Sequence, residues 1–239
     1  MYFGGLGYGP MRMMWDPTYV LVLIGVLISM IASAKVKSTF NRYSRYRAYS
    51  GLTGAQVAER ILHYAGIYDV RIVRVSGSLT DHYNPSTKEV ALSDSVYGQS
   101  SIAAVAVAAH ECGHVIQHDK NYVPLSIRTA LVPVVNFGSG ASWIIIIAGL
   151  ILSMQPLVTV GIFLFSFAVL FQLVTLPVEF DASRRALVVL QDTGILGADE
   201  NRKARKVLSA AAMTYVAAAA AAILQLLRLI LLFGRNNRD

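Results

Sequence analysis

Charged side chains are scarce in this chain, and one long stretch has none. Only 15% of the 239 residues are Asp, Glu, Lys or Arg, whereas 55% are hydrophobic. Residues 129–178 contain no Asp, Glu, Lys, Arg or His. A pair of soluble helices of that length would show a polar face, so these absences exclude an ordinary soluble protein. They indicate segments that cross a lipid bilayer, separated by segments in water.

The uncharged stretch is long enough to cross a membrane twice. A helix rises ~1.5 Å per residue, so the stretch can reach ~75 Å, whereas the hydrocarbon core of a bilayer is ~30 Å thick. We therefore predict a transmembrane hairpin that reverses near Ser153-Met154-Gln155-Pro156. Two further apolar runs complete a set of four predicted spans, at residues 18–34, 131–152, 157–178 and 211–233. Arg228 lies near enough to the end of the last span to snorkel to the surface.

The first apolar run has a second interpretation, a cleaved signal peptide, because Ala32-Ser33-Ala34 resembles a signal-peptidase site. Its basic cluster, however, comes after the run, within residues 35–47. Positive charge in that position resists translocation, so we favour an uncleaved anchor with residues 35–128 in the cytoplasm. The hairpin returns the chain to the same side, where residues 179–210 are again rich in Lys and Arg.

This topology predicts five segments along the chain. They are a first span within 1–34, a large cytoplasmic segment at 35–128, the hairpin at 129–178, a second cytoplasmic segment at 179–210, and a last span with its tail at 211–239. The formal net charge of +7 then reflects membrane topology, with anionic lipid as the partner rather than nucleic acid. Cys112, the single cysteine, excludes an internal disulfide, as is usual in a reducing compartment.

The large cytoplasmic segment contains signals for helices and strands. Thr53 begins a predicted helix that Gly66 ends. Residues 71–75 and 89–92 alternate like strands, and the turn-forming residues 84–88 between them predict a small β-hairpin or a short sheet. Ser100-Ser101 can cap a further helix, which runs into the chain's histidine-rich stretch.

That stretch contains the sequence His110-Glu111-Cys112-Gly113-His114, which is the H-E-x-x-H motif. Residues four apart lie on one face of a helix, so both imidazoles can bind one zinc ion. Glu111 lies beside the first ligand, where it can act as the general base on a water bound to the metal. The alternative is a structural helix that merely carries two histidines.

A zinc site of this kind needs a third protein ligand. His118 would lie ~12 Å along a straight helix from His110, which is too far for bonds of ~2.0–2.1 Å to one ion. We therefore expect His118 not to bind the metal itself. It can contact a metal ligand, lie on the side where substrate binds, or lie on the surface. Glu179 begins the polar segment directly after the hairpin, which returns it to the side of the motif helix, with Asp181 as its competitor.

Three sequences carry a resemblance to a known family: TDHYNP, VAVAAHECGHVIQH and PVEFDASRRAL. They resemble the YugP-type neutral zinc metallopeptidases, and more distantly the membrane metalloproteases of the HtpX and CAAX prenyl protease type. The resemblance covers nearly the whole chain. It implies His110 and His114 as ligands of one Zn²⁺ per chain, Glu111 as the catalytic base and Glu179 as the third ligand.

The resemblance also raises two points about the surroundings of the metal. HtpX-like sequences have Ala-Asp where this chain has Ala182-Ser183, so either Asp181 takes the supporting role of that aspartate or the role is absent. Their extended strand before the motif helix corresponds to residues 84–93, including Asn84, and would expose an edge to which a substrate backbone can pair.

The oxyanion of a peptidase intermediate needs a donor besides the metal. His82, Tyr83 and His118 are the candidates, and the alternative for Asp81-His82 is an ordinary capped turn. Arg184 or Arg185 can bind a peptide carboxylate, although lipid phosphate is the favoured partner.

We therefore expect a mainly helical integral membrane protein with about four transmembrane helices and a cytoplasmic HExxH metalloprotease element. The predicted function is a zinc endopeptidase of a prokaryotic plasma membrane that cleaves membrane or membrane-proximal polypeptides. The alternative is a non-catalytic scaffold or transporter subunit with a structural metal. No charged residue other than Arg228 lies within a predicted span, which disfavours transport, and a structural metal needs no general base at Glu111.

Overall fold

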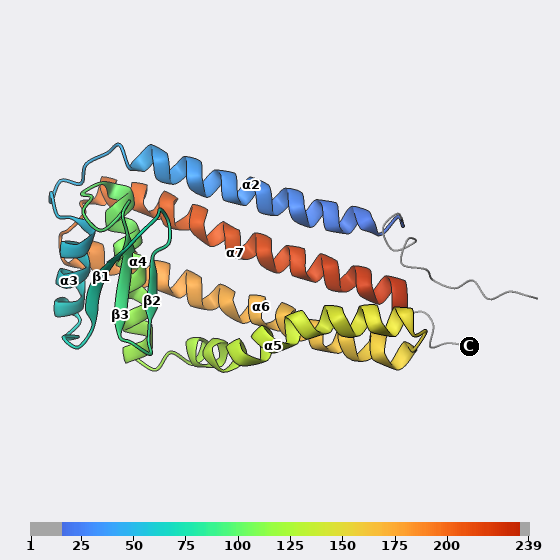
Figure 1. Cartoon of the computed structure of the whole chain (residues 1–239). Coiled ribbons are helices and arrows are strands. Elements are labelled where there is room, and N and C mark those ends of the chain that lie inside the picture. Colours follow the sequence, from blue (N-terminus) through green and yellow to red (C-terminus); the bar gives the residue numbers. More distant parts are fainter. Residues whose placement is uncertain (1–15, 235–239) are drawn as a thin grey trace, which may run out of the picture. The chain divides into compact units, whose positions relative to one another are not determined.

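The computed structural model describes residues 16–234, so the first fifteen residues of the predicted N-terminal segment and the last part of the tail lie outside it. The helices are α2 (Tyr19–Tyr43), α3 (Gly54–Tyr64), α4 (Ile102–Asp119), α5 (Val123–Ile151), α6 (Gln155–Asp192) and α7 (Ala198–Phe233), and the strands are β1 (Arg71–Val75), β2 (His82–Asn84) and β3 (Glu89–Ser93) (Figure 1). The expected mainly helical fold is confirmed.

The chain divides into two compact units, and each is described by itself. The span unit consists of the described parts of Met1–Met30, Arg128–Val174 and Val216–Asp239. The HExxH unit consists of Ile31–Ile127 and Thr175–Tyr215.

Four helices are long and apolar enough to cross a membrane, namely α2, α5, α6 and α7. This confirms the predicted number and order of the spans. The helices nevertheless extend well beyond the apolar runs, because α6 continues to Asp192 and α7 already begins at Ala198. Hydropathy falls where the first charged residues appear, but Glu, Lys and Arg are good helix formers, so the backbone stays helical.

The predicted reversal joins α5 to α6 within the span unit. Ser153 takes a left-handed conformation with φ of 53°, and α6 begins two residues later. The Gln155 side chain donates a 2.9 Å hydrogen bond to the carbonyl of Phe233, at the end of α7. Small residues allow close packing, since a Cβ on Gly161 would lie 2.4 Å from a side-chain carbon of Ile146.

The position of Arg228 differs from the prediction. Its side chain is only 4% exposed and forms a 2.9 Å ion pair with Asp16. The guanidinium also lies 5.4 Å from the ring centroid of Tyr19. The expectation that Arg228 snorkels to the surface is therefore wrong, because a carboxylate far away in the sequence meets it inside the unit.

The HExxH unit contains a three-stranded sheet of order β1-β3-β2. β1 pairs with β3 in parallel, and β2 pairs with β3 in antiparallel orientation. The predicted short sheet is confirmed, with its hairpin between β2 and β3 rather than between the two predicted strands. The expected exposed edge along residues 84–93 is wrong for Glu89–Ala91, because this part of the central strand β3 pairs with both β1 and β2. The edge strands are β1 and β2.

The helices of this unit begin where the sequence predicts. Thr53 and Gln56 form a reciprocal capping box at the start of α3, and Ser101 accepts a 3.2 Å hydrogen bond from the backbone of Ala104 at the start of α4. Along α4 most side chains from Ile102 to Ile116 are buried in the core of the unit. Burial within the protein therefore accounts for the apolar character of this helix.

Candidate metal site

Two helices bring three metal-binding side chains together. His110 and His114 lie one turn apart on α4, with ring centroids 4.7 Å apart. The Glu179 carboxylate on α6 lies 3.3 Å from Nε2 of His110 and 3.6 Å from Nε2 of His114. One ligand atom from each residue lies within 4.8 Å of the others. Two imidazoles and one carboxylate are a known donor set of catalytic zinc, which keeps its fourth position for water.

The close approach of α4 and α6 depends on a residue inside the motif. A Cβ on Gly113 would lie only 2.4 Å from the carbonyl oxygen of Ala182 on α6. Glycine at this position therefore lets the two backbones nearly touch. Ala182 follows Glu179 by three residues, so the same contact holds the carboxylate level with the two imidazoles.

Each ligand imidazole has a polar partner on its other nitrogen. Nδ1 of His110 lies 3.1 Å from the hydroxyl of Ser183, and Nδ1 of His114 lies 3.0 Å from Oε1 of Gln117. Such partners fix the orientation of a ring and leave Nε2 to face the metal. In both histidines it is Nε2 that faces Glu179.

Gln117 is fully buried and connects the two helices. Its amide nitrogen donates a 2.8 Å hydrogen bond to the carbonyl of Val178 and a 3.0 Å hydrogen bond to Asp181. Asp181 also forms ion pairs with Arg184 and Arg185. Asp181 therefore reaches His114 only through Gln117. Ser183, in contrast, contacts the imidazole of His110 directly.

Sequence reasoning missed Gln117 and Ser183 as neighbours of the metal ligands. Gln117 lies three residues after His114, on the same face of the helix, so helical spacing was a usable signal. Ser183 lies four residues after Glu179 on α6, so helical spacing was a usable signal here too.

Glu111 is 7% exposed, on the helix that carries both histidines. Burial raises the pKa of its carboxyl, against the lowering effect of the neighbouring His110 and His114. A raised pKa makes a carboxylate a stronger base, which suits a group that accepts a proton from water. Cys112 also lies inside the motif and is fully buried. Burial raises the pKa of its thiol, so the side chain stays protonated and belongs to the core.

The candidates outside the motif lie around β2 and the end of α4. The Tyr83 hydroxyl lies 3.1 Å from Nδ1 of His118. Among the described residues, the group able to hold a metal does not include His118, in agreement with its helical spacing. Nδ1 of His82 lies 3.0 Å from the carbonyl of Thr80. The side chain of His82 is exposed.

The neighbours of His82 have structural partners. Asp81 accepts a 2.7 Å hydrogen bond from the backbone of Ser93, at the end of β3, so it joins two parts of the sheet and does not cap a local turn. Asn84 accepts hydrogen bonds from the backbone of Ser86 and Thr87 within the turn that follows β2. The Asn84 side chain therefore stabilises that turn, and its role on the substrate side stays a prediction.

Comparison with known proteins agrees with this geometry. Residues 18–234 match the family described as "Putative neutral zinc metallopeptidase". The chain is 47% identical to the "Putative membrane protease YugP" of Bacillus subtilis (strain 168), over 222 residues that make up 92% of this chain and 98% of the relative. No solved structure matches the chain. The predicted zinc cofactor agrees with the family and with the donor set of His110, His114 and Glu179. The chain therefore belongs to this family of zinc metallopeptidases, and its four long apolar helices make it an integral membrane member.

Proposed function

We propose that the protein is a membrane-embedded zinc endopeptidase in which His110, His114 and Glu179 hold one Zn²⁺ and Glu111 is the general base. The observation that supports this most directly is the distance of 4.8 Å or less between one ligand atom of each of the three residues. Histidine and glutamate donors converge from two helices, and Ser183 and Gln117 keep Nε2 of both imidazoles directed at the carboxylate.

When bound, Zn²⁺ lowers the pKa of a coordinated water and polarises a peptide carbonyl. Glu111 takes the proton from the attacking water and passes it to the leaving amine. Burial raises the pKa of Glu111, which suits a group that must both gain and lose a proton.

The substrate is a polypeptide in or near the membrane, and its backbone adds to the free edge of β2. This strand packs against α4 and is an edge of the sheet. Tyr83 on β2 is a candidate donor to the oxyanion. Burial raises the pKa of Tyr83, so its hydroxyl stays protonated and able to donate.

The active site faces the cytoplasm of a prokaryotic cell. The residues beyond the apolar stretches of α2, α6 and α7 are rich in Lys and Arg, which the positive-inside rule places in the cytoplasm. The five segments proposed from the sequence, including the catalytic segment 35–128 and the hairpin 129–178, follow from this orientation. A cysteine introduced in place of Asp199 should react with a membrane-impermeant thiol reagent only after the cells are opened.

The deciding experiment is metal analysis of the purified full-length protein in detergent. Wild-type protein should contain about one zinc per chain, Glu179→Ala should lose it, and His118→Ala should keep it. Loss of zinc in His118→Ala but not in Glu179→Ala would contradict the ligand set.

A second variant separates an enzyme from the alternative of a structural metal. Glu111→Gln should keep its zinc but lose proteolysis of an unfolded polypeptide by about 10²–10⁴-fold, as removal of a general base does. Proteolysis at the wild-type rate in Glu111→Gln would show that Glu111 is not the base.

A further inference from the structure

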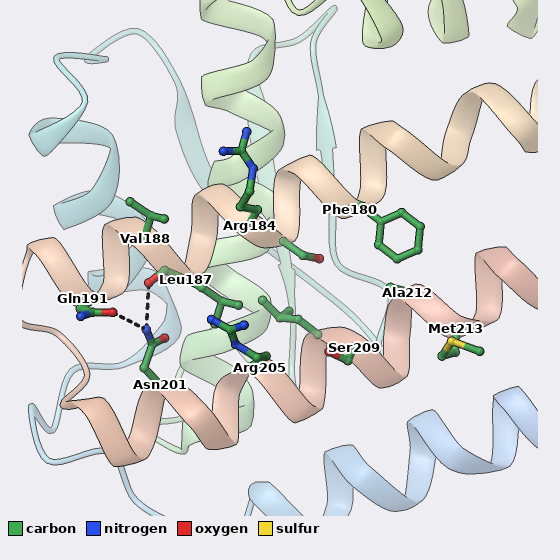
Figure 2. Close-up of a pocket in the computed structure, with 12 residues that line it drawn as sticks. Phe180, Arg184, Leu187, Val188, Gln191, Asn201, Arg205, Ser209, Ala212 and Met213 are labelled. Atoms are coloured by element: carbon green, nitrogen blue, oxygen red, sulfur yellow. Dashed lines mark hydrogen bonds between the residues drawn. The ribbon is translucent and has the colours of Figure 1, made fainter.

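The HExxH unit contains an open groove between the C-terminal part of α6 and the N-terminal part of α7 (Figure 2). Its volume is about 480 Å³, and all its lining residues lie between Phe180 and Met213. The groove is not part of the group of metal ligands. Ser183 lines it and also contacts Nδ1 of His110, the ring nitrogen on the opposite side from Glu179. The groove thus lies behind a ligand imidazole, away from the face at which a peptide would be cleaved.

The two ends of the groove differ in polarity. Figure 2 shows Phe180 and Met213 at one end and Gln191 and Asn201 at the other, with Arg205 between them. Phe180 and Met213 are about half exposed, at 49% and 51%. At the polar end the Asn201 amide donates hydrogen bonds to the carbonyl of Leu187 and to the side chain of Gln191. The groove therefore offers an apolar surface that leads into a polar one.

The charged side chains that line the groove are both positive. They are Arg184 and Arg205, and none of the described residues that line the groove carries a carboxylate. Arg184 shares Asp181 with Arg185, and its own side chain is 72% exposed at the rim. Among residues 16–234 no ion pair involves Arg205. A ligand of this groove should therefore be an anion with an apolar part.

The position of the groove along the helices identifies the kind of anion. On α6 the uncharged stretch ends at Val178, just before Phe180. On α7 no charged residue follows Lys206 until Arg228, so Met213 already lies in the apolar run. The groove therefore spans the level at which lipid headgroups meet acyl chains, and basic pockets at this level bind lipid phosphate.

We propose that this groove binds an anionic phospholipid. Arg205 holds the phosphate, Arg184 adds positive potential at the rim, and an acyl chain packs along Phe180 and Met213. This site is separate from the proposed zinc chemistry, so its test needs no peptidase activity.

The test measures thermal unfolding of the full-length protein in neutral detergent with added dioleoyl phosphatidylglycerol or dioleoyl phosphatidylcholine. A ligand that binds the native state raises the unfolding temperature. Wild-type protein should unfold at a higher temperature with the anionic lipid than with the neutral one. Arg205→Gln should lose most of this difference, and Arg205→Lys should keep part of it.

The matched control is Arg202→Gln, which removes the same charge from the same helix. Arg202 pairs with Asp199 and does not line the groove, so this variant should keep the wild-type difference between the lipids. Equal losses in Arg202→Gln and Arg205→Gln would overturn the proposal in favour of non-specific charge. Equal stabilisation by glycerol phosphate alone would also overturn it, because the acyl chain would then contribute nothing.

A variant at the apolar end keeps the proposal testable if Arg205→Gln does not fold. Phe180→Ser leaves both arginines in place and should reduce the stabilisation by phosphatidylglycerol. An unchanged difference between the two lipids in Phe180→Ser would contradict the proposed acyl contact.

Discussion

The two units each bury a charged side chain on a long helix, and they do so in different ways. In the span unit, Arg228 is paired with Asp16, an opposite charge of fixed sign. In the HExxH unit, Glu179 is 2% exposed and faces two imidazoles, which are charged only when protonated and are metal ligands when neutral. A fixed ion pair neutralises both charges, whereas a carboxylate grouped with neutral imidazoles offers three lone pairs to a cation. The Asp16–Arg228 pair joins the start of the first span to the last helix. The group of Glu179 with two imidazoles fits a metal ion.

The largest effect is expected from breaking the ion pair of the span unit. Asp16→Ala leaves Arg228 buried without its carboxylate, which should cost about 3–5 kcal/mol in the free energy of unfolding. Zinc content should not change, because the proposed ligands His110, His114 and Glu179 belong to the other unit. Denaturant titration in detergent and metal analysis measure the two quantities.

The double variant Asp16→Leu with Arg228→Leu is the control for this prediction. Replacing both charges by apolar side chains should recover most of the lost stability. If Asp16→Ala is as stable as the wild type, or if it loses its zinc, the proposed division of roles between the two buried charges is wrong.

The second prediction concerns the contact that sets the level of Glu179. Gly113→Ala places a methyl group where only 2.4 Å separates it from the carbonyl oxygen of Ala182, so α4 and α6 must move apart. Overpacking of this kind costs about 1–3 kcal/mol, and the shift should also weaken zinc binding. Gly98→Ala is the matched control, because nothing lies within 4 Å of a Cβ at that position. Equal zinc affinity in the two variants would contradict the role of Gly113.

Much of this architecture was predictable because it depends on local patterns. Absence of charge identified the spans, capping residues identified the starts of α3 and α4, and helical spacing separated His118 from the ligands. A hairpin of two spans returns the chain to the side from which it left. This topology predicted Glu179 as the candidate partner of the two histidines. Its role as a ligand remains a prediction that metal analysis tests.

Other features were not predictable because they depend on tertiary contacts. The ends of α6 and α7 run past the apolar stretches, since helicity does not stop where hydropathy does. Strand β2 has only three residues and exists through its pairing with β3. The Asp16–Arg228 pair joins residues 212 positions apart. None of these features leaves a periodic signal in the sequence.

The third prediction tests the partner of a ligand imidazole. Gln117→Ala removes the acceptor from Nδ1 of His114, and loss of such a partner typically weakens metal binding by about 10–100-fold. Competition with a zinc chelator measures this change. Gln99→Ala, on the exposed surface of the same unit, should bind zinc as the wild type does. Wild-type affinity in Gln117→Ala would mean that Gln117 only joins the two helices.

The smallest effect on stability and zinc content is expected at Tyr83, whose hydroxyl lies next to His118 and outside the group of His110, His114 and Glu179. Tyr83→Phe keeps the ring and removes only the hydroxyl, so zinc content and the unfolding temperature should hardly change. An oxyanion is charged, so loss of a hydrogen-bond donor to it should slow peptide cleavage by about 10²–10³-fold. The decrease should appear in kcat rather than in KM, because such a hydrogen bond forms only in the transition state. An unchanged kcat in Tyr83→Phe, together with a reduced kcat in His118→Ala, would transfer the donor role to His118.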